Sequence, residues 1–348
     1  MDRRRFLAAA GLAGAGLVAG CGSLQEQSTR SPPLVENRPD ATYYPTHSEG
    51  MKMIGMGDAG EYKVGLTYSY PHRFWTVTGT TAEQVTIRDA DSVHLMASVW
   101  DPETNMVLPI QSGVSITVES DGETVADKQP WPMVSQNMGF HYGDNYQIDG
   151  EGVYDITVRV EGMTERRLGS FSGKFGGAGE LNTNWEFSRS ARDNISYTEH
   201  PDRQGSRAAV GLMNMEMMPT SQAPAPEDLP GELLGTAKGS DEVYAATWLT
   251  DADFLDSGQS YLAVSVRTPY NRVPLPMMSL DGTVDVGGET VYDDAFSAAV
   301  HPDVGYHYGA VVEATGEPSV SVETIGPSQV SRHEGYETAF LGTPTVEF

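Results

Sequence analysis

Histidine and methionine are the residues in this chain whose types and spacing could do chemistry. The 348-residue sequence contains only 8 histidines, alongside 15 methionines. His141 follows a segment that contains Met133 and Met138. An imidazole with a thioether is a donor set that suits copper, Cu(I) above all, and suits Mg²⁺ or Ca²⁺ poorly. Spacing alone makes this a weak signal, because methionine in proteins is mostly packing material.

Two other groups of these residues have plain structural explanations. His94 lies in the apolar run 93–97, which is typical of a core strand, and a single histidine there is most often hydrogen-bonded and structural. Four methionines surround Glu216, namely Met213, Met215, Met217 and Met218. A hydrophobic plug at a domain junction explains that cluster more simply than a metal site does.

Motifs of the common catalytic types are missing from the sequence. There is no cysteine nucleophile, Gly-x-Ser-x-Gly elbow, phosphate loop, dinucleotide fingerprint or HExxH helix. A Ser/His/Asp triad can always be assembled on paper from such a composition, so it carries little weight. We therefore expect a binding protein and not an enzyme, with an extracellular hydrolase as a distant alternative.

Short strands must position these side chains. Runs of alternating apolar and polar residues recur in both halves, at 115–118, 154–160, 261–266 and 319–322, with Asp-Gly and Gly-Gly turns between them. This pattern indicates an antiparallel sandwich, and no convincing amphipathic helix accompanies it. The sequence thus predicts an all-β chain of two tandem Ig-like β-sandwich domains, at 47–200 and 227–348, joined by a linker at 201–226.

The two halves also share a hidden repeat. A Leu-Pro pair, a Gly-Glu-Thr-Val turn and a Gly-aromatic-His-Tyr-Gly segment follow one another in both halves, the last at 139–143 and 305–309. The Gly-Glu-Thr glycine precedes the histidine by 19 residues in each copy. Three matches in order, with one spacing, indicate a duplication.

The N-terminus is typical of an export and lipidation signal. Three arginines and Phe-Leu at 3–7 precede an apolar run ending at Gly20 that is too short for a permanent membrane helix. This pattern predicts a twin-arginine lipoprotein signal at 1–20. Cys21, the only cysteine, ends a segment that looks like a lipobox. We expect an extracytoplasmic protein anchored to membrane lipid through Cys21, with a flexible tether at 21–46.

The charge balance is strongly acidic. The chain has 22 Lys+Arg against 48 Asp+Glu, a formal net charge of −26. A surface of this sign does not bind nucleic acid. In molar salt the screening length falls to about 3 Å and self-repulsion largely disappears. We interpret the acidity as adaptation to high salt, as in halophilic archaea.

Three consecutive segments of the first half carry a recognisable signature. They are Trp-Pro-Met-Val-Ser at 131–135, Gly-Phe-His-Tyr-Gly-Asp-Asn at 139–145 and Gly-Glu-Gly-Val-Tyr at 150–154. Together they resemble the periplasmic iron-transport-associated lipoproteins. The resemblance implies an Ig-like fold, bound copper, a tendency to form homodimers and a place beside a membrane iron permease. It also implies copper ligands at Met133 and His141, and a third at His94.

The chain departs from that family in two respects. The loop between Met133 and His141 is one residue longer, and residues 161–179 contain no histidine where the family has a histidine-rich loop. One ligand is therefore missing or replaced, and His72 is the candidate replacement.

The second half is expected to be a diverged repeat. It keeps His307, but Tyr261 and Ala299 align with His94 and Met133. Weaker second-domain candidates for a different metal site are His301, His307 and His333, together with Met277 and Met278. A structural role for these residues is the simpler interpretation.

Two functions stay open at this point. The first is a cell-surface lipoprotein that binds copper, or alternatively iron, in iron or copper uptake beside an iron permease. The second is a non-enzymatic envelope interaction or structural module without metal, in which the His-Tyr-Gly segments stabilise a loop.

Overall fold

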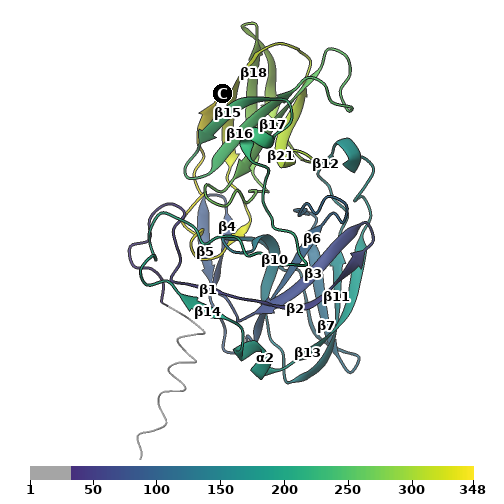
Figure 1. Ribbon diagram of the computed structural model, residues 1–348, viewed down its shortest axis with the longest axis vertical. Helices are drawn as coiled ribbons and strands as arrows, with labels where there is room; N and C mark the ends of the chain where they lie inside the picture. Colours follow the sequence, from purple (N-terminus) through teal and green to yellow (C-terminus); the bar gives the residue numbers. More distant parts are fainter. Residues whose placement is uncertain (1–32) are drawn as a thin grey trace, which may run out of the picture.

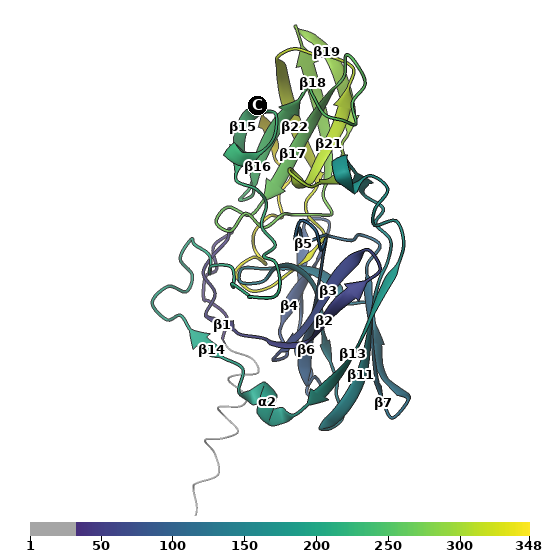
Figure 2. The same cartoon turned by 45° about the vertical axis from the view of Figure 1, so that its right-hand side comes forward.

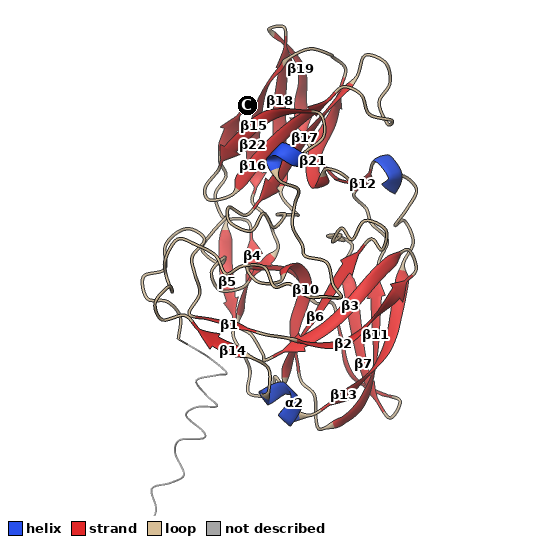
Figure 3. Cartoon of the chain, viewed as in Figure 1, coloured by secondary structure: helices blue, strands red, loops and turns tan. Residues whose placement is uncertain are grey.

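The computed structural model describes residues 33–348, and its regular structure is almost entirely β (Figure 3). The helical pieces are short: η1 (Gly169–Phe171), α2 (Arg189–Asp193) and η2 (Pro226–Asp228). The prediction of an all-β fold is confirmed. The expected signal at 1–20 and the lipidation site at Cys21 lie outside the described residues. Between residues 33 and 348, no helix is long and apolar enough to cross a membrane.

Two sheets form the body that is lower in Figure 1. The larger has eight strands, in the order β2 (Lys52–Ala59), β3 (Tyr62–Ser69), β6 (Val93–Trp100), β10 (Gly139–Tyr146), β9 (Trp131–Ser135), β23 (Ser331–Arg332), β4 (Phe74–Thr78) and β5 (Thr81–Val85). The smaller has the order β13 (Gly179–Phe187), β11 (Gly152–Val160), β7 (Val114–Ser120) and β8 (Glu123–Lys128). A short ribbon pairs β1 (His47–Glu49) with β14 (Tyr197–Glu199). Alternate residues of β7 and β11 are buried, as expected for strands that turn one face to a core.

Two further sheets form the upper body, seen from another side in Figure 2. One has the order β12 (Arg166–Arg167), β20 (Ser297–His301), β21 (Gly305–Val312), β17 (Ser260–Arg267), β16 (Val243–Leu249) and β15 (Glu232–Lys238). The other has the order β19 (Glu289–Ala295), β18 (Ser279–Val286), β22 (Pro318–Gly326) and β24 (Thr345–Glu347). The hairpin β9–β10 and the hairpin β20–β21 have the same register, with His141 opposite Met133 and His307 opposite Ala299. This matching geometry fits the proposed duplication.

Each body contributes one short strand to a sheet of the other body. β12 follows β11 in the chain but pairs in parallel with β20. β23 follows β22 in the chain but lies between β9 and β4, where Ser331 pairs with Met133 and Arg332 with Trp75. The two sandwiches are therefore tied together by backbone hydrogen bonds, and residues just beyond β23 enter the first sandwich.

The tether is shorter than the sequence indicated. Residues 41–46 are buried, and the Tyr43 hydroxyl donates a 2.5 Å hydrogen bond to Glu337. The Thr42 N–H donates to Asp241 at 2.6 Å. Polar composition suggested a free segment up to residue 46, but the Thr42 backbone and the Tyr43 side chain have hydrogen-bond partners nearly 200 residues or more away along the chain. In the expected linker 201–226, Ser221 and Ala223 are likewise buried.

Every residue of β6 is buried, so both faces of the eight-stranded sheet are covered around it. Leu95 and Ala97 belong to the hydrophobic core. Successive residues of a strand point to opposite faces, so His94 and Met96 lie on the other face. We call this second face the outer face, and the candidate site lies on it.

Candidate metal site

Four donor side chains converge on the outer face of the eight-stranded sheet. Met133 on β9 lies directly opposite His141 on β10, and His94 on β6 lies opposite Asn145 on β10. Residues directly opposite each other on antiparallel strands share a face. His333 follows β23, and its N–H donates to the Val134 carbonyl at 3.1 Å. The ligand nitrogens of His94, His141 and His333 all lie within 4.8 Å of one another.

Gly143 explains how a thioether and an imidazole reach the same space. It lies between His141 and Asn145 on the same side of β10. A Cβ at this position would be 2.5 Å from His94 Nε2 and 3.0 Å from Met133 Sδ. Both donor atoms therefore point over Gly143, and any larger side chain would fill the space between them.

Hydrogen bonds hold two imidazoles in the tautomer that a metal requires. His94 Nδ1 donates to Asn145 Oδ1 at 2.9 Å, and His141 Nδ1 donates to the Gly139 carbonyl at 3.1 Å. With Nδ1 protonated, each ring keeps the lone pair of Nε2 free. Bonds of this kind on the distal nitrogen are typical of metal-bound histidines.

The Nε2 atoms of His94, His141 and His333 are all buried and have no hydrogen-bond partner. An unpaired buried polar atom costs about 1–3 kcal/mol. Three such atoms in one cluster are unusual for a folded protein. A bound metal ion would accept all three lone pairs and remove that cost.

Burial also keeps these rings neutral. Loss of hydration lowers the pKa of His94 to about 4, against the opposing effect of the hydrogen bond that His94 donates to Asn145. The same cause lowers the pKa of His141 to about 3. Burial and the neighbouring imidazoles lower the pKa of His333 as well. Neutral imidazole is the form that binds a metal ion. At neutral pH all three rings are therefore in the form that can coordinate a cation.

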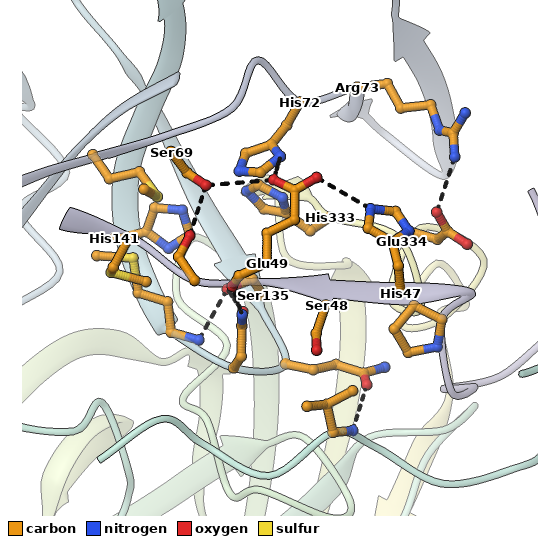
Figure 4. A pocket seen from close by; sticks show the side chains of 18 of the residues that line it. His47, Ser48, Glu49, Ser69, His72, Arg73, Ser135, His141, His333 and Glu334 are labelled. Atoms are coloured by element: carbon orange, nitrogen blue, oxygen red, sulfur yellow. Dashed lines mark hydrogen bonds and ion pairs between the residues drawn. The ribbon is translucent and has the colours of Figure 1, made fainter. Parts of the chain in front are cut away.

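His72 lies beside this cluster. Its ring centroid is 4.7 Å from that of His94 and 5.2 Å from that of His333. Its Nδ1, however, is 3.2 Å from one carboxylate oxygen of Glu49, whose other oxygen is 3.4 Å from His47 Nε2 (Figure 4). Asn145 fixes the backbone at His72, accepting its N–H at 3.0 Å and donating to its carbonyl at 2.7 Å. The structure thus places His72 next to the three clustered histidines, with its ring engaged by Glu49.

A cavity of about 90 Å³ leads to the site (Figure 4). His72, His141 and His333 line its wall. Three methionines also line it: Met51, Met96 and Met138. The approach to the cluster therefore offers both imidazole and thioether groups.

At the corresponding place in the second sandwich, His307 has no free ring nitrogen. His307 is buried, but its Nε2 lies 3.0 Å from the Tyr261 hydroxyl and its Nδ1 donates to the Gly305 carbonyl at 2.9 Å. Ala299 stands where the first sandwich has Met133. Both nitrogens of His307 have partners, so this histidine has a complete structural role.

The remaining weaker candidates do not form a second-domain cluster. His301 packs its ring 6.0 Å from Phe254, and its Nδ1 accepts the Asp303 N–H at 3.1 Å. His333, grouped with His301 and Met277/Met278 from the sequence, belongs to the first-sandwich cluster instead, because β23 carries it there. Sequence reasoning missed this placement. The available signal was the missing fourth ligand in the first half and a spare histidine in the second.

The comparisons with known proteins each cover only part of the chain. Residues 227–348 match a family model described as a domain of unknown function (DUF7350). No curated protein matches the chain. Among solved structures, a copper-bound variant of FetP from a uropathogenic Escherichia coli strain is 22% identical, with a TM-score of 0.27, covering 39% of this chain and 95% of that one. The same protein in its as-isolated form, expressed in the periplasm, is 19% identical, with a TM-score of 0.27, covering 40% of this chain and 95% of that one.

Proposed function

We propose that this chain is an extracytoplasmic copper-binding lipoprotein. His94, His141 and His333 supply Nε2 donors and Met133 a thioether. The observation that carries this proposal is a cluster of three histidines in which each Nε2 is buried and unpaired and one ring nitrogen of each ring lies within 4.8 Å of the others.

The donor set supports copper over the alternatives. Imidazole and thioether are soft to borderline ligands, which favour copper and disfavour Mg²⁺ or Ca²⁺. Bonds from a metal to imidazole are about 2.0–2.1 Å long. Donors on one ion are thus at most about 4.2 Å apart, and the observed spread of 4.8 Å needs only a small closure.

His307 is an internal reference for the rival proposal, a structural module without metal. Where this fold uses the same histidine structurally, Tyr261 satisfies Nε2. In the first sandwich the residue aligned with Tyr261 is His94, which itself has an unpaired Nε2. A purely structural role for His141 leaves that difference unexplained.

The role in the cell follows from the N-terminal signal and the resemblance, and we propose it on that ground. Cys21 would anchor the mature protein to the outer side of the cell membrane. The metal site would then serve copper or iron uptake beside an iron permease, by binding and not by catalysis. A homodimer is a further expectation from the resemblance.

The test is titration of Cu(I) and Cu(II) into the full mature chain, with the His141→Ala variant and a matched His307→Ala control. Loss of a hydrogen-bonding neighbour of a ligand typically costs 10–100-fold in affinity. Loss of His141 itself should therefore lower copper affinity by more than about 100-fold. His307→Ala should leave copper affinity unchanged. Equal Cu(II) affinities for wild type and His141→Ala would rule out this site.

His333→Ala separates this geometry from a site built by the first sandwich alone. Because His333 reaches the cluster through β23, its loss should weaken copper as much as His141→Ala does. Unchanged affinity in His333→Ala would mean that His72 or another group is the fourth ligand.

A further inference from the structure

Methionines continue across the outer face beyond the histidine cluster. Cross-strand pairing links Met53 on β2 to Thr67, Thr67 to Met96, and Met96 to Gly143. Directly opposite residues share a face, so this row of side chains runs from the edge strand to the glycine beneath the metal site. Met96 lies in this row between Thr67 and Gly143, and it is buried.

A second row on the same face, two residues away along β3, starts at Met56 on β2. Met56 lies opposite Gly65, and Gly65 lies opposite Ser98. A Cβ at Gly65 would collide with Met218 Sδ. The Met218 sulfur therefore occupies the place where the side chain of residue 65 would be. Opposite Cβ positions are about 5 Å apart, so the flexible Met56 thioether can reach this sulfur.

The segment 213–218 carries three further methionines, Met213, Met215 and Met217, next to Met218 in the chain. Met215 and Met218 form a β-bridge, with the Met218 N–H donating to the Met215 carbonyl at 3.3 Å. The Met213 N–H donates to the Asn137 carbonyl at 2.6 Å, which attaches the segment to the wall of the cavity.

Met218 belongs to the hydrophobic core and Met56 and Met215 pack against it, so exposure sets Met217 alone apart from a simple hydrophobic plug. Met218 is buried, but Met215 is only partly buried and Met217 is 60% exposed. A plug would bury its apolar side chains, whereas a site that captures an ion from solution needs donors that solvent can reach. Thioether sulfur favours Cu(I) among the biological metals.

We propose that Met56, Met215, Met217 and Met218 form a second, thioether-only site for Cu(I). Strands in a sheet are about 4.8 Å apart. The new site over β3 is therefore two strands, or about 10 Å, from His141 on β10. It lies outside the histidine cluster and does not depend on the function proposed for that cluster.

The experiment is anaerobic titration of the full mature chain with Cu(I), in competition with a chromophoric Cu(I) chelator. Met215→Leu/Met217→Leu/Met218→Leu should bind one equivalent of Cu(I) fewer than wild type. Methionine-to-leucine changes conserve volume and usually cost under about 1.5 kcal/mol, so the fold should persist. The matched control is Met163→Leu, a buried methionine away from the outer face that should leave the stoichiometry unchanged. Met215→Leu/Met217→Leu, which spares the buried Met218, repeats the test should the triple variant unfold.

A second arm separates this site from the histidine cluster. In His94→Ala/His141→Ala, one equivalent of Cu(I) should remain, and X-ray absorption should show sulfur ligands only. Wild type should bind one equivalent of Cu(II) but two of Cu(I). Undiminished Cu(I) stoichiometry in the leucine variants would overturn the inference. Failure of the histidine site alone would leave the sulfur-only site in place, so the two proposals fail in different ways.

Discussion

Acidification gives a sensitive test of the histidine cluster, because burial has moved its titration far below the ordinary range. A histidine of ordinary pKa, about 6.5, is mostly protonated at pH 5, and proton competition would weaken each metal bond by about 30-fold. With the pKa of His94 at about 4 and that of His141 at about 3, both rings stay neutral at pH 5. Protonation of His94 would then weaken binding by only about 10% at this pH. For these two ligands, copper affinity should change by less than about twofold from pH 7.5 to pH 5, against about 1000-fold for exposed rings.

The measurement is a competition titration with a chelator whose own pH dependence is known, repeated at intervals from about pH 7.5 down to about pH 3. Affinity should hold down to about pH 4 and fall below it, since protons compete only near the folded pKa values. A fall of 100-fold or more by pH 5 would refute the buried, neutral cluster.

Folding must be followed in the same samples. The unfolded chain takes up protons below about pH 6.5, whereas the native rings do not. Each of these two imidazoles therefore makes the metal-free protein less stable as pH falls, by about 2 kcal/mol at pH 5. Circular dichroism of the metal-free protein separates loss of fold from loss of affinity.

Three further predictions concern the glycine under the site, the salt response and the anchor. Gly143→Ala should abolish Cu(II) binding while preserving the far-ultraviolet spectrum, because its Cβ would sit between the His94 and Met133 donors. Gly177→Ala, which meets no atom within 4 Å, is the control, and Cu(II) binding by Gly143→Ala would count against this geometry. Thermal melts should rise from low to molar KCl, since screening removes repulsion within a chain of net charge −26, and a flat series would contradict the halophilic interpretation. Cys21→Ser should release the protein from membranes or leave it uncleaved, and a variant that stays anchored after normal processing would exclude lipidation at this residue.

The candidate ligands that the resemblance implied are those whose positions follow from local pairing. Met133 and His141 belong to one hairpin, so alternation and a short loop suffice to place them opposite each other. The apolar run around His94 favoured a structural histidine, and the resemblance alone made it a candidate; it lies on the neighbouring strand of the same sheet. The all-β class likewise follows from patterns a few residues long.

Only the tertiary structure decided the fourth candidate donor and the surroundings of the proposed site. His333 lies 192 positions after His141, and it reaches the cluster because β23 leaves its own sandwich and pairs in parallel with β9. No local periodicity encodes a pairing between a two-residue strand and a sheet of the other domain. The burial that lowers the histidine pKa values, the neutral tautomers set by Asn145 and Gly139, and the methionine row above Gly65 depend in the same way on contacts between distant segments. The sequence by itself determined the strands and the donor types, and the packing of one sandwich on the other determined which donors meet.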